Sequence, residues 1–135
     1  MNSASLLRAP AIPLVVHDPF FSYWLPSENP TAAFVCHWTG SVNRWDGILR
    51  VDGKPYIFLG RGISVTGTRL DSLKNEIYPT RTILYYEADG IRLKVTYLTP
   101  ALPHDLEIMS RPATYVTTEI ESVDGKTHNV EVAFF

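Results

Sequence analysis

The chain has 135 residues, of which 45% are apolar and 19% are charged. This apolar content is enough to build a folded core, and it excludes wholesale disorder. Twelve basic residues against fourteen acidic ones leave no positive excess, which argues against a nucleic-acid partner. No run approaches the roughly 18–20 apolar residues that a membrane helix needs, so no membrane partner is expected either.

The first residues of the chain do not resemble a secretory leader. Leu6 and Leu7 are followed by Arg8 and then by two prolines, so no continuous apolar stretch develops. The sequence is therefore compatible with a cytoplasmic protein, and equally with a secreted or periplasmic protein whose leader has been removed. Cys36 is the only cysteine, which excludes an internal disulfide and a thiolate-rich zinc site.

The composition favours β-structure. Val, Ile and Thr make up about a quarter of the chain, and such β-branched residues fit a pleated sheet better than a helix. Ten prolines and eight glycines interrupt the sequence every few residues and leave little room for long helices. We therefore expect an all-β fold, an antiparallel β-sandwich built from hairpins and either complete or incomplete.

The first predicted hairpin follows an irregular stretch. Residues 18–43 combine aromatic side chains with prolines and predict loops. Asp52-Gly53 then suits a type I′ turn, because both central residues of that turn need positive φ. This turn pairs residues 47–51 with residues 54–59 and sets Leu49 opposite Tyr56 and Ile48 opposite Ile57.

The second hairpin is the clearest predicted element. It follows another irregular segment, 61–78, within which residues 70–76 are expected to form one or two helical turns. Asp89-Gly90 is again a type I′ signal. The register that it sets aligns four pairs on the apolar face: Ala88–Ile91, Tyr86–Leu93, Leu84–Val95 and Thr82–Tyr97. A slip of one residue would exchange the buried and the wet face, so we expect this register to be firm.

A proline-containing segment, 100–112, is predicted to cross between the two sheets of the sandwich. Its apolar residues are expected to turn inward: Leu106, Ile108 and Met109.

The third predicted hairpin joins residues 114–123 to residues 127–135. A three-residue loop, Asp124 to Lys126, sets Ile120 opposite Val130, although it also opposes Glu119 to Glu131. A two-residue loop would instead set Ile120 opposite Asn129 and fits less well.

The chain divides into two predicted parts. Residues 1–62 form an N-terminal segment with the aromatic stretch and the first hairpin, and residues 63–135 form the start of the sandwich. The last strand runs into Phe134 and Phe135 without a turn or a polar tail. An uncovered strand invites association, so we expect this chain to be the N-terminal part of a longer protein. Exposed strand edges would also permit a homo-oligomer.

Three residue sets could carry chemistry, and each has a plainer interpretation. Cys36 and His37 are adjacent, but neighbours on a strand point to opposite faces, so Cys36 is expected to be a buried thiol. Three histidines with two aspartates lack the spacing of a metal site: His17, His37, His104, Asp18 and Asp105. The loop carboxylates could form a glycosidase-type pair, but they are expected to be turn formers or solvated charges: Asp18, Glu28, Asp46 and Asp105. We predict no catalytic residue, metal or cofactor in this chain.

Several short motifs resemble the start of glutaminase A-like proteins of bacteria and fungi. They follow one another in the order expected for that family: residues 8–22, His37-Trp38-Thr39-Gly40, residues 48–54, Phe58-Leu59-Gly60, Leu98-Thr99-Pro100, Asp105-Leu106 and Ser110-Arg111-Pro112. The resemblance spans nearly the whole chain. It implies an N-terminal β-sandwich that leans on a C-terminal helical domain like that of six-hairpin glycosidases. It also implies a parent protein that hydrolyses glutamine to glutamate and ammonia.

The aromatic stretch is the candidate binding surface. Its rings could form core packing, an interface with the downstream helical domain, or a ligand platform. The residues that we assign to a ligand or interdomain interface are Trp24, His37, Trp38, Arg44 and Trp45. The expected function is thus a non-catalytic scaffold of a glutaminase A-like hydrolase. The alternative is a stand-alone carbohydrate- or ligand-binding module with exposed tryptophans.

Overall fold

A computed structural model describes residues 9–62 and 65–135. The predictions about the leader and Arg8 therefore lie outside the described residues. Within the described ranges, no helix is of a length and apolarity that could cross a bilayer. The strands are β1 (Ile12–Val16), β2 (Ser22–Leu25), β3 (Gly47–Val51), β4 (Lys54–Leu59), β5 (Thr68–Arg69), β6 (Lys74–Tyr78), β7 (Arg81–Ala88), β8 (Ile91–Leu98), β9 (Tyr115–Ser122) and β10 (Val130–Phe134), and the helix is α1 (Leu106–Met109).

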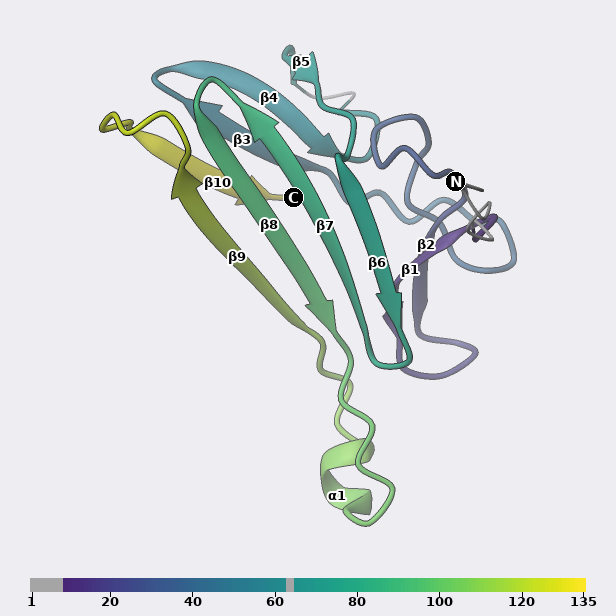
Figure 1. Cartoon of the computed structure of the whole chain (residues 1–135). Helices are drawn as coiled ribbons and strands as arrows, with labels where there is room; N and C mark the ends of the chain where they lie inside the picture. Colours follow the sequence, from purple (N-terminus) through teal and green to yellow (C-terminus); the bar gives the residue numbers. More distant parts are fainter. Residues whose placement is uncertain (1–8, 63–64) are drawn as a thin grey trace, which may run out of the picture.

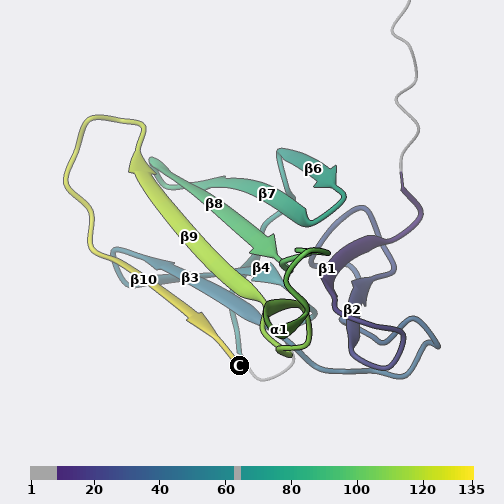
Figure 2. The ribbon, with the colours of Figure 1, turned by 90° about the horizontal axis from the view of Figure 1, so that it is seen from below.

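The strands form two four-stranded sheets and one small sheet (Figures 1 and 2). Sheet B has the order β10-β3-β4-β5, sheet C has the order β6-β7-β8-β9, and β1 pairs with β2. All pairs are antiparallel except the short β4–β5 pair. Sheets B and C lie face to face and do not close into a barrel. The fold is thus the predicted antiparallel β-sandwich, in its incomplete form.

Apolar side chains from both sheets fill the space between them. Leu49 and Phe58 come from sheet B, and Leu84, Leu93 and Val95 come from sheet C. All five side chains are fully buried, so each contributes about 1.5–3 kcal/mol of hydrophobic stabilisation. This inter-sheet layer is the main core of the molecule.

Gly47 is required by the same packing. A Cβ at this position would lie 2.6 Å from the ring of Phe58. The close approach lets Phe58 fill the layer between the sheets.

The first two hairpins have the predicted turns and registers. Leu49 faces Tyr56 in the β3–β4 hairpin, and all predicted pairs of the β7–β8 hairpin are present. Asp52 and Asp89 have φ values of 49° and 43°, and the glycine after each is also positive. These values are those of a type I′ turn, whose twist matches that of the flanking strands.

The third predicted hairpin is wrong, because its two strands join different sheets. β9 pairs with β8, so that Glu119 lies opposite Lys94. β10 pairs with β3, so that Glu131 lies opposite Arg50. The predicted hairpin would have opposed the two glutamates to each other, whereas the observed pairing gives each of them a cation. Residues 123–129 therefore pass from one sheet to the other (Figure 2).

The helical turns predicted for residues 70–76 are also wrong. The last three residues of that stretch, 74–76, belong to the edge strand β6, which pairs with β7, and residues 70–73 form no helical turn. Lys74 lies over the ring of Tyr85, and the hydroxyl of Tyr85 donates to Glu76 at 3.1 Å. Pairing with β7 thus overrides the weak local preference for a helical turn.

The segment predicted to cross between the sheets instead protrudes from the molecule. It joins β8 to β9, which are neighbours in sheet C, and carries α1 at its tip (Figure 1). Leu106 is 74% exposed, and Met109 is exposed as well. The expectation that these residues turn inward is therefore wrong, because no sheet lies beneath them. We call residues 99–114 the finger.

The two predicted parts of the chain share one sandwich. β10 of the second part pairs with β3 of the first part, and residues of both parts fill the same core. The division between residues 62 and 63 remains a prediction.

Candidate functional site

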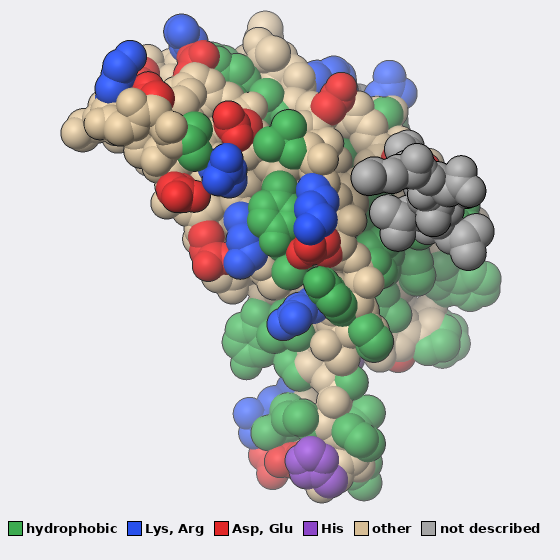
Figure 3. Space-filling model, in the orientation of Figure 1, with side chains coloured by type: hydrophobic (Ala, Val, Ile, Leu, Met, Phe, Trp, Pro, Cys, Tyr) green, Lys and Arg blue, Asp and Glu red, His purple; other side chains and the backbone are tan. Residues whose placement is uncertain are grey.

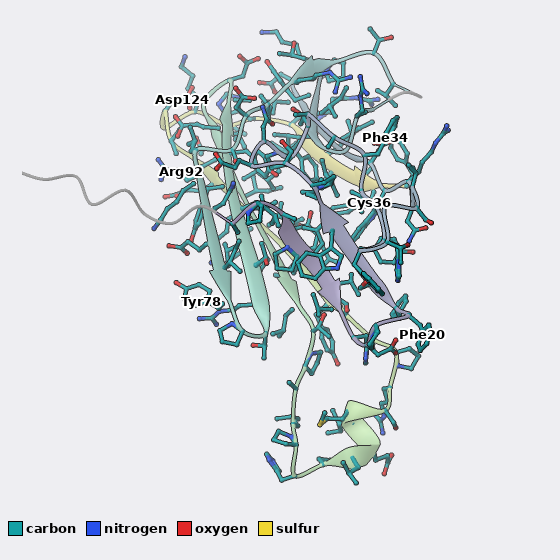
Figure 4. The ribbon with its side chains drawn as sticks, turned by 90° about the vertical axis from the view of Figure 1, so that its right-hand side faces the viewer. Phe20, Phe34, Cys36, Tyr78, Arg92 and Asp124 are labelled. Atoms are coloured by element: carbon teal, nitrogen blue, oxygen red, sulfur yellow. The ribbon has the colours of Figure 1, made fainter. Side chains whose placement is uncertain are left out.

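The sandwich has two ends of different chemistry. At one end, the β3–β4 turn, the β7–β8 turn and the β9–β10 connection come together, and we call this the turn end. At the other end, the β1–β2 turn, the loop that contains His37 and Trp38, and the finger come together, and we call this the finger end. Figure 4 places Asp124 at the first end and Phe20 at the second.

The three Asp-Gly turns converge at the turn end around His128. The imidazole Nδ1 lies 2.7 Å from Asp52 Oδ2, and Nε2 lies 3.0 Å from Asp124 Oδ1. A backbone hydrogen bond joins the same two segments, since Asn129 N–H donates to Asp52 Oδ1 at 2.9 Å. The neighbouring β7–β8 turn contacts the β9–β10 connection, because Val123 N–H donates to the carbonyl of Gly90 at 2.8 Å.

Hydrogen bonds and charges shift the pKa values of these groups. The hydrogen bonds to Asp52 and Asp124 raise the pKa of His128 above its ordinary value. The hydrogen bond with His128, followed by that from Lys126 N–H, lowers the pKa of Asp124 to about 2. Backbone N–H of Asn129, followed by His128, lowers the pKa of Asp52. A protonated His128 thus bridges two carboxylates on two different turns.

The contacts of this cluster join the β9–β10 connection to the neighbouring turns. A second contact links the adjacent turns: Lys54 and Asp89 form an exposed ion pair at 2.9 Å. Asp124 Oδ1 also accepts from Lys126 N–H at 2.9 Å, so this oxygen holds both the imidazole and the backbone. We call the bridge of His128 to Asp52 and Asp124 the His128 latch. Sequence reasoning missed His128, although its position three residues after the third Asp-Gly signal could have drawn attention to it.

The finger end brings His37 and Trp38 together at one carbonyl. The oxygen of Pro19 accepts from Trp38 Nε1 at 2.5 Å and from His37 Nε2 at 3.0 Å. Thr39 N–H lies 3.3 Å from His37 Nδ1, which assigns the proton of His37 to Nε2. Both residues therefore fix the β1–β2 turn, and Trp38 remains 62% exposed.

The β1–β2 turn also contacts the stem of the finger. Ala113 N–H donates to His17 Nε2 at 2.9 Å, and Val16 N–H donates to Thr99 Oγ1 at 3.4 Å. Phe20, at the tip of the β1–β2 turn, is 93% exposed. The turn, the His37–Trp38 loop and the finger thus form one continuous surface.

The other predicted site residues lie elsewhere. Trp45 belongs to the core, with its ring 5.5 Å from Tyr97 and 5.9 Å from Phe134 between centroids. Trp24 is half-buried in β2, and its Nε1 has no hydrogen-bond partner among the described residues. Arg44 is exposed beside Trp45 in the chain. Of the five predicted residues, the structure brings only His37 and Trp38 into mutual contact.

Cys36 is a buried residue without an activating partner in the described part of the chain. Its backbone pairs with Trp24, and burial raises the pKa of its thiol, which disfavours the nucleophilic thiolate. Among the described residues, no group of three or more His, Cys, Asp or Glu side chains is arranged to hold a metal ion.

Three of the four loop carboxylates are turn formers or caps. Asp18 accepts from Phe20 N–H and Phe21 N–H at 2.7 and 2.8 Å. Asp105 caps α1 through Ile108 N–H at 3.0 Å, and Asp46 accepts from Gly62 N–H at 3.0 Å. Bound in this way, these carboxylates are not free to act as an acid and base pair.

A shallow hollow on the outer face of sheet C also lacks free chemical groups. It is lined by Tyr85, Arg92, Lys94, Glu119, Ile120 and Glu121. Its charges are already paired, Lys94 with Glu119 and Arg92 with Glu121. Figure 3 shows this face as interspersed blue and red side chains.

These features define a class of protein: an incomplete antiparallel β-sandwich region with an apolar loop surface at one end and a polar latch at the other. Residues 1–66 match a family described as a domain of unknown function (DUF4964), and residues 80–134 match a second one, DUF5127. No solved structure matches the chain significantly.

Two named relatives are similar to nearly the whole chain. Glutaminase A of Aspergillus oryzae is 32% identical over 139 residues, which cover 97% of this chain and 20% of that protein. A protein of Arthroderma benhamiae named "probable glutaminase" is 27% identical over 138 residues, which cover 90% of this chain and 16% of that protein. The chain is thus similar to glutaminase A-like proteins over nearly its whole length, and the two domain matches fit the N-terminal domain of such proteins. It spans a fifth or less of the length of these relatives.

Proposed function

We propose that this chain is the non-catalytic N-terminal β-sandwich of a longer glutaminase-like hydrolase and supports a helical catalytic part further along the same polypeptide. The proposed reaction of the whole protein is the hydrolysis of glutamine to glutamate and ammonia. Support comes from the glutaminase names of two relatives that are similar over at least 90% of the chain.

The observation that carries this proposal is the apolar surface at the finger end. Phe20, Trp38 and Leu106 are large apolar side chains, and each is at least 62% exposed. The green side chains of the finger in Figure 3 belong to this surface. Several large apolar side chains exposed at one end of a folded domain are typical of a surface that another surface covers. We assign that covering surface to the helical part of the same protein.

The chemistry of the described residues supports a role without catalysis. The thiol is buried, and three loop carboxylates hold backbone N–H groups. The imidazole with a shifted pKa, His128, lies between two carboxylates at the turn end. Amide hydrolysis by covalent catalysis needs a nucleophile within reach of a general base. None of these contacts of the described residues provides such a pair.

The geometry gives less support to a carbohydrate-binding module. Such a module needs a row of exposed rings, but Trp45 contacts core rings and Trp24 is half-buried. Of the three tryptophans, Trp38 alone is exposed, at 62%, and the other two are half-buried. Titration of this chain with oligosaccharides should therefore produce no saturable change in tryptophan fluorescence. A saturable change that disappears in Trp38→Ala would favour the module.

Matched substitutions test the proposed docking surface. The extended polypeptide is this chain followed by the downstream part of a glutaminase-like protein. Leu106→Ser removes an apolar side chain from the finger, and Leu73→Ser removes a comparably exposed leucine outside it, at 64%. In the 135-residue chain, both variants should keep the wild-type melting temperature, because neither leucine is buried.

In the extended polypeptide, Leu106→Ser should lower the melting temperature by several degrees and Leu73→Ser should not, because only the former side chain would become buried on docking. Differential scanning fluorimetry measures both. Equal effects of the two variants in the extended polypeptide would contradict the assignment of the finger end as the interface.

A further inference from the structure

Burial falls sharply from β8 to β9 along the inner face of sheet C. Leu93 and Val95 of β8 are fully buried in the core. Their direct partners on β9, Ile120 and Thr118, are both exposed, Ile120 at 45%. Directly opposed residues of neighbouring strands point to the same face of a sheet. The inner side of β9 therefore faces the layer between the sheets but has little packed against it.

Sheet B shows the same loss of cover on the same flank. Leu49 and Val51 of β3 are fully buried, whereas their partners Val132 and Val130 on β10 are only half-buried. β9 and β10 are the outermost strands of their sheets, and Figure 2 shows them on the same side of the molecule. The core is thus open along one flank, between the β9 edge and the β10 edge.

The β9 edge is built to accept another strand. In the described part of the chain, β9 pairs only with β8, so the backbone groups on its other edge have no strand partner. The eight residues of β9 contain no proline, and no register shift interrupts its pairing with β8. Prolines and bulges are the usual devices that stop an edge strand from pairing. With neither device present, the edge is open to a strand of suitable chemistry.

We propose that a further β-strand of the same longer polypeptide pairs with the free edge of β9 and closes this flank. This strand would place apolar side chains over Ile120 and Thr118 on the inner face. It would place polar or basic side chains beside Glu119 and Glu121 on the outer face. The inference rests on the proposed function, because it takes the strand from sequence beyond this region. This chain spans only 20% and 16% of the two named relatives, so proteins of that length are long enough to contain such a strand.

A second copy of this chain is a poorer occupant. Antiparallel pairing of two β9 strands centred on Ile120 would bury both isoleucines. The same register would set Glu119 of each copy opposite Glu121 of the other, and like charges directly opposed on a sheet are destabilising. A strand from elsewhere in the polypeptide is free of this conflict.

Hydrogen exchange on the unmodified proteins tests the pairing directly. Amides of β9 that do not bond to β8 should exchange at least about tenfold more slowly in the extended polypeptide than in the 135-residue chain, because pairing forces exchange through a local opening. Equal exchange in the two proteins would overturn the proposal. Ammonia release does not enter this measurement, so its result is separate from the test of the proposed function.

Two lysine substitutions on β9 test the face that becomes covered. Ile120→Lys changes the inner face, and Thr117→Lys changes an exposed residue on the outer face of the same strand. In the extended polypeptide, Ile120→Lys should lower the melting temperature by several degrees more than Thr117→Lys, because only the former buries a charge. Ile120→Thr provides a milder variant with the same expected order if the lysine variant does not fold.

In the 135-residue chain, the two lysine variants should differ little, because Ile120 is already half-exposed there. Equal effects of the inner and outer substitutions in the extended polypeptide would overturn the proposal.

Analytical ultracentrifugation of the 135-residue chain tests the other candidate occupant, a second copy of this chain. A dimer that protects the β9 amides and dissociates in Ile120→Lys would assign the edge to a second copy and overturn the proposed strand.

Discussion

His128 joins elements that are distant in the sequence. It follows β9, yet its imidazole contacts Asp52 in the β3–β4 turn and Asp124 in the connection to β10. Charged groups of every turn at this end face the cluster, including Asp89, Lys54 and Lys126. At the scale of single residues, this bridge ties the connection between β9 and β10 to the β3–β4 turn of sheet B.

The His128 latch makes stability depend on pH in a defined direction. The pKa of His128 is raised above 6.5, so its contribution is complete below pH 6.5 and is lost as the pH rises through the higher folded-state value. The pKa values of Asp52 and Asp124 are lowered from 3.8, so their contributions are present above that value and are lost on further acidification. The latch is therefore strongest between these two limits.

We expect His128→Asn to lower the melting temperature more at about pH 5.5 than at about pH 8.5, because the charged bridge is complete at the lower pH and is lost as the pH rises through the raised pKa of His128. His104→Asn, at an exposed position on the finger, is the matched control and should show no such difference. Thermal unfolding followed by circular dichroism measures both variants. A loss in His128→Asn that is the same at both pH values would contradict the latch.

Two core tyrosines carry hydroxyls that the described residues leave without hydrogen bonds. Tyr86 and Tyr97 are almost fully buried, and burial raises the pKa of each well above the ordinary value. Tyr97→Phe should change the free energy of unfolding by only about 0–1 kcal/mol, and toward greater stability, because it removes an unpaired polar atom. Tyr85→Phe, which loses the hydrogen bond to Glu76, should be destabilising. Urea unfolding compares them, and a clear destabilisation by Tyr97→Phe would mean that its hydroxyl has a partner.

At the scale of elements, sequence motifs predicted the turns and registers that depend only on neighbouring residues. The two Asp-Gly turns that close hairpins were predictable with their registers, because positive φ and the alternation of side chains act within about ten residues. The third Asp-Gly signal failed, since β9 and β10 pair with the distant strands β8 and β3, and Glu119 and Glu131 gain cations in that pairing. His37 and Trp38 were predictable from the aromatic stretch. His128 was not, because its two partners are 76 and 4 residues away and meet only in the fold.

A charge exchange tests the observed pairing of β8 with β9. Glu119→Lys places two lysines opposite each other and should lower the melting temperature, and the double variant Lys94→Glu/Glu119→Lys should recover much of the loss. The difference should shrink in high salt, because the pair is exposed and screened. If Glu119→Lys alone raised the melting temperature, by placing a lysine opposite Glu131, the hairpin between β9 and β10 would be correct after all.

At the scale of the whole molecule, the two ends and the open flank have complementary roles. The turn end is polar, and its latch ties the β9–β10 connection to the β3–β4 turn. The finger end and the β9–β10 flank expose apolar residues of the kind that a folded domain usually covers. We propose that the uncovered surfaces belong to the remainder of a longer glutaminase-like protein. In this account, the sandwich positions and supports the catalytic part and takes no part in the reaction.

Ammonia release from glutamine tests this account most directly. The assay compares the 135-residue chain with the extended polypeptide at equal molar concentration. The account predicts that the extended polypeptide releases ammonia and that the 135-residue chain stays at the buffer background, because its one thiol is buried and three of its loop carboxylates hold backbone N–H groups. Saturable ammonia release by the 135-residue chain alone, retained through purification, would contradict it.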